Sequence, residues 1–337
     1  KIATINITGN RVFDEKQLLE LFSLRTPGWL TWYTKNDQYS RQKLQGDIET
    51  MRSFYLNSGY ADFAVESTQV SITPDKREIY ITVNVVEGEK YTVTGVTLAG
   101  DTLVPKSELE KLITIRSGEP FSRERVNETV KKISDRLGNE GYAFANANAV
   151  PEIDREKRTV AFSIFVDPGR RVYVRRINIA GNTKTRDEVI RREMRQLEGA
   201  FYDAGKVSLS KQRVDRTQYF SEVEVETPAV PGTSDQVDVN LKVVEKPTGS
   251  LMFGLGFSNV DKVVIQGQIS QANIFGSGKT ISAQVNRGRV NKVLSFGYYD
   301  PYFTVDGIGV GFDAYNREVD ATVLNIGNYK TRTVGAG

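Results

Sequence analysis

The chain has 337 residues and a formal net charge of +3, and it contains neither histidine nor cysteine. This length allows two to four domains, and the nearly balanced charge gives no electrostatic argument for binding nucleic acid. Disulfides and thiolate metal ligands are excluded, and the commonest general base is missing. A Ser-His-Asp or Cys-His site therefore cannot be built from this chain.

The chain has no apolar run of about 18 residues, so we expect no transmembrane helix. It starts at Lys1 directly in a strand pattern, with no signal peptide, and its last residues read as the middle of a strand. We therefore interpret it as a piece of a longer protein.

One pattern occurs three times: alternating apolar residues, then glycine, then asparagine or aspartate. The three copies are at residues 2–10, 93–101 and 174–182. Self-similarity of this kind indicates a repeated module.

Each module reads strand, helix, helix, strand, strand, which predicts a tandem α+β fold. Periodicity and turn residues place the elements after each first strand. In the first module we expect helices at 14–22 and 40–57 and strands at 64–72 and 79–86. In the second we expect helices at 106–113 and 123–137 and strands at 143–151 and 159–166. In the third we expect helices at 185–196 and 205–217 and strands at 221–227 and 237–244.

The second helix of the first two modules is followed by glycine and tyrosine. Gly59 and Gly141 can adopt the left-handed conformation that ends a helix. The third module breaks this pattern, because the corresponding segment, RTQYF, has no glycine.

The domain boundaries follow from the short joints between these units. We assign modules to 1–89, 90–169 and 170–247, and a strand-only segment to 248–337. The joints EGEK and DPGRR are short, which predicts modules whose orientations are restricted.

From Gly249 the apolar residues recur at every second position. Leu251, Phe253, Leu255 and Phe257 share one face of the first strand. A soluble sandwich and a membrane barrel both produce this alternation. The small, uncharged opposite face and the aromatic residues at strand ends favour the barrel. Those aromatic residues are Tyr298, Tyr299, Tyr302 and Phe303.

The segment after Gly249 has room for five or six antiparallel strands, whereas the smallest closed barrels use eight. An open sheet leaves unsatisfied edges in lipid, so we expect the remaining strands beyond Gly337.

Two further motifs have competing interpretations. GSGKT at 276–280 resembles the end of a phosphate-binding loop, but an alternating strand follows it, so a hairpin turn is the better interpretation. Trp29 and Trp32 lie in a loop that either caps the core of the first module or contacts a partner.

The motifs together resemble the BamA family, the central subunits of the bacterial outer-membrane β-barrel assembly machine. INITGN, RSFYLNSGYADF and STQVSITPDK resemble the third POTRA domain of that family. VRRINIAGN and VIRREMRQLEGAF resemble its fifth POTRA domain, and YYDPYFTVDG resembles an early barrel strand. The resemblance implies a non-enzymatic insertase of the outer membrane that uses no cofactor, with its POTRA modules in the periplasm. We therefore expect no catalytic, cofactor-binding or metal site.

The resemblance also implies partners. The edge strand 64–72 is expected to recruit a β-propeller lipoprotein by strand addition, since an exposed edge offers main-chain hydrogen bonds. A helical-repeat lipoprotein is expected on the third module at Arg191, Arg195 and Glu198. Unfolded outer-membrane proteins and outer-membrane lipid complete the expected partners. The strand-addition residues are Val65, Ser67, Gln69, Val70 and Ser71.

The first barrel strand is expected to be a lateral gate that pairs with incoming strands. Gly254 and Gly256 weaken it, while its apolar side chains anchor it in lipid. The gate residues are Leu251, Phe253, Gly254, Leu255, Gly256 and Phe257.

Two other classes remain open. One is a POTRA-barrel polypeptide transporter of the TamA or two-partner secretion type. The other is a soluble periplasmic scaffold whose last segment is a sandwich.

Overall fold

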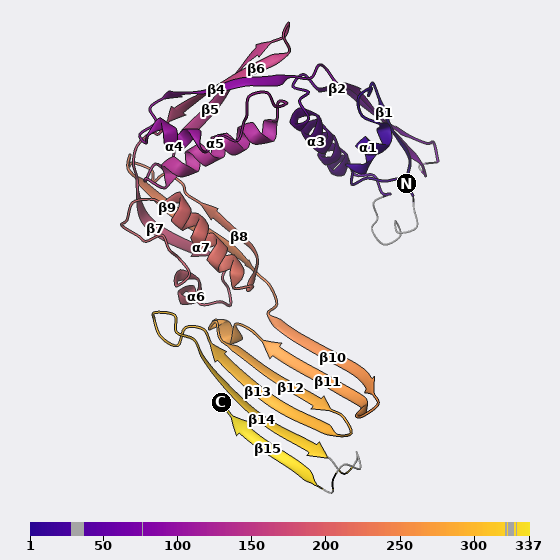
Figure 1. Cartoon of the computed structure of the whole chain (residues 1–337), viewed down its shortest axis with the longest axis vertical. Coiled ribbons are helices and arrows are strands. Elements are labelled where there is room, and N and C mark those ends of the chain that lie inside the picture. Colours follow the sequence, from indigo (N-terminus) through magenta and orange to yellow (C-terminus); the bar gives the residue numbers. More distant parts are fainter. Residues whose placement is uncertain (28–36, 76, 321, 323–326, 328) are drawn as a thin grey trace. The chain divides into compact units, whose positions relative to one another are not determined.

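The computed structural model describes residues 1–27, 37–75, 77–320, 322, 327 and 329–337. Within these described residues, the strands form three three-stranded sheets and one six-stranded sheet (Figure 1). The α+β fold predicted from the sequence is confirmed. Trp29 and Trp32 lie outside the described residues. Among the helices of the described part, none is long and apolar enough to cross a membrane.

In the described part of the first module, the helices lie on one face of the strands (Figure 1). The central strand β3 pairs in parallel with β1 and antiparallel with β2. Leu18, Met51 and Tyr55 from the helices are fully buried beside Ile81 and Val83 of β3. The elements are β1 (Ile2–Thr8), α1 (Glu15–Glu20), α3 (Arg41–Asn57), β2 (Ala64–Ile72) and β3 (Ile79–Val86).

The second and third modules repeat this order, with sheets β4-β6-β5 and β7-β9-β8. The second comprises β4 (Thr92–Gly100), α4 (Lys106–Glu110), α5 (Arg123–Gly138), β5 (Asn146–Asp154) and β6 (Thr159–Asp167). The third comprises β7 (Tyr173–Ala180), α6 (Asp187–Arg191), α7 (Ala204–Arg216), β8 (Phe220–Glu226) and β9 (Gln236–Glu245).

The first helices of the second and third modules are shorter than the periodicity predicts. After Glu110 and Arg191 the backbone hydrogen bonds reach back three residues instead of four, as from Ile113 to Glu110 and from Met194 to Arg191. The chain leaves the α-helix through these tighter turns. Arg195 and Glu198 therefore lie in a turn region and not on a helix face.

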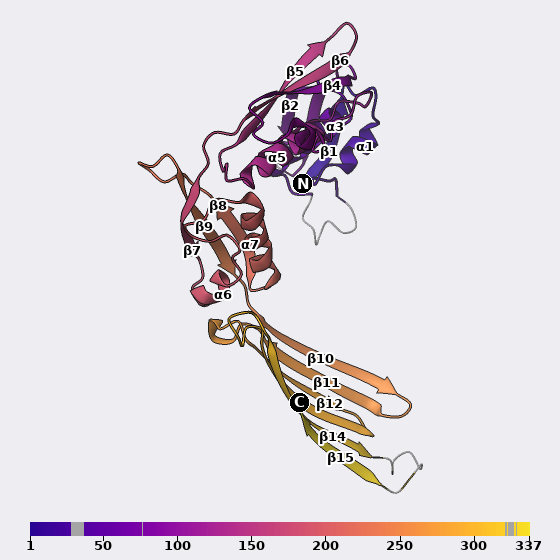
Figure 2. The same cartoon turned by 60° about the vertical axis from the view of Figure 1, so that its left-hand side comes forward.

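The six-stranded sheet is a simple antiparallel meander in which each strand pairs with the next in sequence. It forms a single layer, and β10 and β15 are its edges (Figure 2). Its strands are β10 (Gly249–Ser258), β11 (Lys262–Gln271), β12 (Thr280–Arg287), β13 (Asn291–Asp300), β14 (Val310–Asp320) and β15 (Lys330–Ala336). The GSGKT segment follows a short turn, η1 (Ile274–Gly276), and leads into strand β12, so the hairpin interpretation is confirmed.

Candidate functional site

Strand β2 is an edge of the first module's sheet and, within the described chain, pairs only with β3. Its register with β3 shifts between Val65 and Ser67, which marks a bulge at Glu66. Val65 and Val70 consequently pack against the core, whereas Gln69 and Ser71 are exposed. Because the bulge changes the phase of the strand, Val65 does not share a face with Ser67, Gln69 and Ser71, as a regular alternation along β2 would predict.

The exposed face of β2 carries polar side chains. Asn84 donates its side-chain amide to Ser67 Oγ at 2.6 Å, which fixes one hydroxyl on the exposed face. Polar, partly exposed side chains beside an unpaired backbone edge permit strand addition without a continuous apolar surface.

Arg191 and Glu198 come together beside the edge strand β7 of the third module. The Glu198 carboxylate accepts the backbone N–H of Ile177 at 2.8 Å and lies 3.5 Å from Arg191 Nη1. Arg191 also pairs with Asp187 at 2.9 Å. A shallow groove of about 510 Å³ runs along this edge. It is lined by Arg176, Ile177, Asn178, Ile179, Asp187, Arg191 and Glu198.

Arg195 does not join that group. Its backbone N–H bonds to Ser210 Oγ at 2.7 Å, and its guanidinium donates to the carbonyls of Arg192 and Met194. The structure thus brings two of the three predicted docking residues together and ties the third to α7.

One face of the six-stranded sheet is apolar from β10 to β14. Phe253 and Phe257 are 70% and 73% exposed, which is unusual for phenylalanines in a regular strand. Cross-strand register continues this face through Ile269, Ala283, Phe296 and Ala314. Its other large members are Leu251, Leu255, Val263, Ile265, Ile281, Val285, Leu294, Tyr298 and Phe312.

The opposite face is polar. Met252 aligns in register with Gln268, Gln284, Ser295 and Tyr315 across successive strands. A sheet that is apolar on one face and polar on the other, in a single layer, matches the wall of a membrane barrel with a wet interior.

The strand-end aromatic residues do not act as one girdle. Tyr298 lies on the apolar face and stacks on Phe312 with ring centroids 6.4 Å apart. Tyr299 lies on the opposite face, and Tyr302 contacts the third module. The Arg192 guanidinium stacks 4.2 Å from the Tyr302 ring centroid, and Arg213 donates to the Tyr302 hydroxyl at 3.1 Å.

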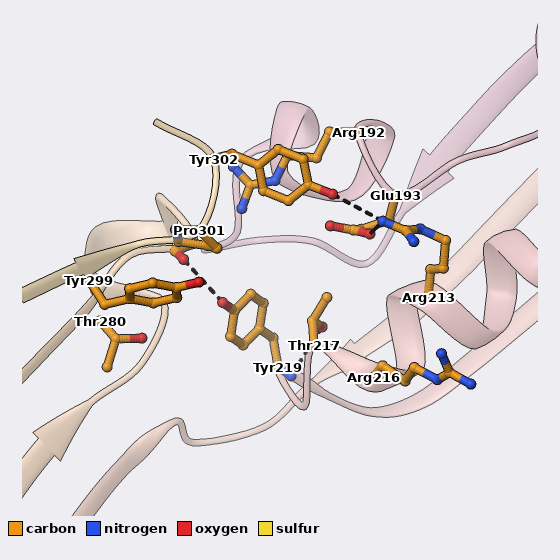
Figure 3. A pocket seen from close by; sticks show the side chains of 11 residues that line it. Arg192, Glu193, Arg213, Arg216, Thr217, Tyr219, Thr280, Tyr299, Pro301 and Tyr302 are labelled. Atoms are coloured by element: carbon orange, nitrogen blue, oxygen red, sulfur yellow. Dashed lines mark hydrogen bonds and ion pairs between the residues drawn. The ribbon is translucent and has the colours of Figure 1, made fainter. Parts of the chain in front are cut away.

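These contacts border a pocket of about 400 Å³ between the third module and the sheet (Figure 3). Figure 3 shows Tyr302 from the sheet beside Arg192 and Arg213 of the module. Glu193 pairs with Arg213 at 2.8 Å, and the Tyr219 hydroxyl donates to the Gly278 carbonyl at 3.1 Å. Burial raises the pKa of Tyr219, so it stays a neutral donor. The pocket is lined by Arg192, Glu193, Arg213, Arg216, Thr217, Tyr219, Gly278, Thr280, Tyr299, Pro301 and Tyr302.

Sequence reasoning missed two glutamates that organise the modules. Glu245 accepts the backbone N–H groups of Lys184 and Thr185 at 3.0 and 2.6 Å and the Thr183 hydroxyl at 2.8 Å. Burial alone would raise the pKa of Glu245, but these hydrogen bonds lower it to about 2. Glu87 accepts from Arg11 and Val12 in the same way. A sequence signal could have identified these glutamates, since Glu87 and Glu245 each follow a Val-Val pair at the end of a module's last strand.

Comparisons with known proteins agree with this architecture. The POTRA family model, described as a surface antigen variable number repeat, matches residues 1–88, 91–169 and 172–246. The Omp85 superfamily domain matches residues 273–337.

Two relatives are named outer membrane protein assembly factor BamA. That of Neisseria meningitidis is 38% identical over all of this chain and 43% of its own length. That of Buchnera aphidicola is 31% identical over 99% of this chain and 54% of its own length. The chain therefore spans about half the length of these relatives.

A solved structure of Haemophilus influenzae BamA POTRA3-5 is similar, with a TM-score of 0.64 and 32% identity. The match covers 73% of this chain and 96% of that structure. BamA from Haemophilus ducreyi without POTRA domains 1–3 also matches, with a TM-score of 0.64 and 34% identity over 73% of this chain and 47% of that one. With three matched modules and relatives along its whole length, the chain belongs to the POTRA family and is a relative of the BamA assembly factors.

Proposed function

We propose that this chain is part of an outer-membrane protein assembly factor, with its sheet in the outer membrane and its POTRA modules in the periplasm. The observation that carries the proposal is the succession of three POTRA modules and a single-layer sheet with one apolar face. The assembly role of the named relatives supports it. The exposed Phe253 and Phe257 side chains on a single-layer sheet support a barrel wall over a soluble sandwich. The matches to BamA along the whole chain favour assembly over polypeptide transport.

The working edge in this proposal is β10, the lateral gate expected from the sequence. Its outer side is unpaired in the described chain, and Gly254 and Gly256 contribute no side chain to hold a neighbour. The apolar face of this strand is formed by Leu251, Phe253, Leu255 and Phe257, and these side chains anchor the strand in lipid. An anchored strand with a free edge can template an incoming strand of an unfolded outer-membrane protein.

Single cysteines test the gate cleanly, because the chain has none of its own. Met252→Cys on β10 and Gln284→Cys on β12 lie in the same cross-strand row and on the same face. With a cysteine-bearing, unfolded outer-membrane protein as substrate, we expect disulfide crosslinks at least about fivefold more abundant at Met252→Cys, since β10 has an unpaired backbone edge in the described chain whereas β12 pairs on both sides. Equal crosslinking at both positions would remove the gate from the proposal.

The first module is proposed to recruit a β-propeller lipoprotein through β2, at Val65, Ser67, Gln69, Val70 and Ser71. The unpaired edge and its exposed polar residues support this. Gln69→Pro removes a main-chain donor and should weaken co-purification of the lipoprotein. The matched control is proline at Val150 of β5, the equivalent edge of the second module. Equal losses from both variants would count against a specific role for β2.

The third module is proposed to dock a helical-repeat lipoprotein with Arg191, Arg195 and Glu198. Because Glu198 also holds the Ile177 N–H, Glu198→Lys changes the module itself. Glu198→Gln retains an acceptor and removes only the charge, so it is the sharper variant. We expect it to weaken docking with little effect on stability, whereas Glu188→Gln on the exposed side of α6 should not. Unchanged docking by Glu198→Gln would contradict the role of its charge.

A further inference from the structure

The pocket between the third module and the sheet carries an excess of positive charge. It is lined by three arginines and a single carboxylate, Glu193. Glu193 is buried and is paired with Arg213. The nearby Lys279 is neutralised by Asp300 at 3.1 Å, so it does not contribute to the excess. The pocket therefore presents about two uncompensated positive charges.

The guanidinium groups retain donors for a ligand. Arg213 uses the same atom, Nη2, for both Glu193 and Tyr302. The Arg192 guanidinium lies over the Tyr302 ring, and Arg216 is exposed without an ion pair in the described part of the chain. The Nε atoms of Arg192 and Arg213 are buried and have no hydrogen-bond partner among the described residues, so the exposed Arg216 guanidinium is the most accessible donor group. Planar guanidinium forks match carboxylate oxygens two at a time.

The position of the pocket indicates where its ligand comes from. Thr280 and Tyr299 pair in register and lie on the polar face of the sheet, in phase with Ser282 and Gly297. The apolar face that would meet lipid is on the other side. A location on the polar face favours an extended polypeptide over a lipid headgroup.

We propose that this pocket binds carboxylate side chains of an extended, acidic polypeptide segment. Arg216 and Arg192 supply the charge, and Tyr219, Tyr299 and Tyr302 form the walls. The proposal rests on the proposed function to the extent that unfolded polypeptide is the natural ligand. It adds a charge-selective contact at the junction of the last module and the sheet.

The test measures peptide binding to the purified full-length protein, which includes the complete barrel, in a neutral detergent at low ionic strength. The probe is a peptide of about ten glycine and serine residues with two central glutamates, blocked ends and an uncharged fluorophore. A matched peptide carries glutamines instead. Arg216→Gln is the pocket variant. Lys211→Gln, an exposed position on the same helix α7 outside the pocket, is the control with the same charge change.

We expect the glutamate peptide to bind at least about tenfold more tightly than the glutamine peptide. Arg216→Gln should remove most of this difference and Lys211→Gln should retain it. Equal binding of the two peptides, or equal losses from both variants, would overturn the proposal. Displacement of the peptide by phosphatidylglycerol micelles but not by zwitterionic ones, dependent on Arg216, would assign the pocket to lipid phosphate instead. The peptide experiment measures binding and not assembly, so a negative result would not contradict the proposed assembly function. A negative result in the crosslinking experiment would likewise not contradict peptide binding by the pocket.

Discussion

A glycine with positive φ follows the first strand of every module for the same reason. Gly9, Gly100 and Gly181 have φ of +89°, +88° and +90°. A Cβ on each would overlap a backbone carbonyl oxygen of the central strand, at Val85, Val166 or Val243. The glycine of the repeated motif is therefore required by a close backbone contact between parallel strands.

The third module has no glycine after its second helix. Gln218 adopts the left-handed conformation there, with φ +62°, where Gly59 and Gly141 have φ of +108° and +101° in the first two modules.

Two glycines of the second module allow the energetic cost of a left-handed backbone to be measured separately from the cost of a close Cβ contact. Gly100 and Gly118 have nearly equal φ, but only Gly100 is in close contact. Gly118→Ala should cost about 1–2 kcal/mol from the left-handed conformation alone. Gly100→Ala should cost clearly more, because β4 and β6 must also separate. Urea unfolding, with hydrogen exchange localising the effect to residues 90–169, measures both. Equal destabilisation by the two variants would contradict the close-contact explanation.

Glu245 makes the stability of the third module depend on pH. Its pKa is lowered from 4.5 to about 2 in the folded state. The stabilisation is therefore complete above about pH 4.5 and is lost as the pH falls toward 2. Glu245→Gln should cost about 1–3 kcal/mol at pH 7, with the difference from wild type shrinking as the pH falls through this window. Urea titrations at several pH values test this, with Glu222→Gln on β8 as an exposed control. A difference that is constant with pH would contradict the assignment.

At the scale of elements, periodicity predicted the long helices and strands, because one face of each is buried and its apolar residues recur with the period of the element. α3 and β2 begin and end within one residue of the expected positions. It failed at α4 and α6, where apolar residues at helical spacing continue into tighter turns. It also failed at β2, since a bulge changes the phase without changing the composition. Which strands lie at the edge of a sheet follows from the strand order, and the alternating sequence pattern does not contain that information.

The two faces of β12 provide a test of membrane insertion. Ala283 lies on the apolar face and its neighbour Gln284 on the polar one. Ala283→Arg should destabilise the sheet in lipid by about 2–4 kcal/mol, whereas Gln284→Arg should have a much smaller effect. Urea-dependent folding of the barrel-containing protein into vesicles measures the difference. If Gln284→Arg proves the more harmful, the assignment of the faces is reversed.

At the scale of the whole molecule, the succession of modules and sheet could be predicted, but the contacts that join the last module to the sheet could not. Thr185 accepts from the Asn273 amide at 2.8 Å, and the Arg186 N–H donates to the Gly276 carbonyl at 3.0 Å. Tyr302, expected in an aromatic girdle, packs on Arg192 instead. These contacts join residues 88 to 110 positions apart, and single-sequence periodicity reports only on neighbours along an element.

These contacts should restrict the orientation of the third module relative to the sheet. Asn273 is buried, donates to Thr185 and accepts the Gly278 N–H at 2.8 Å, so Asn273→Ala removes both the link and the brace of the turn. Spin labels at Glu224→Cys on β8 and Val260→Cys in the β10–β11 turn report the distance between the two parts, since the chain has no other cysteine. We expect one narrow distance distribution in the parent and a broader one after Asn273→Ala. Thr248→Ala, which removes a hydroxyl bonded within the sheet to Ala272, is the control and should leave the distribution narrow. A narrow distribution in all three proteins would show that the orientation is set by the short joint at Lys246 and Pro247 and not by the Asn273 contact.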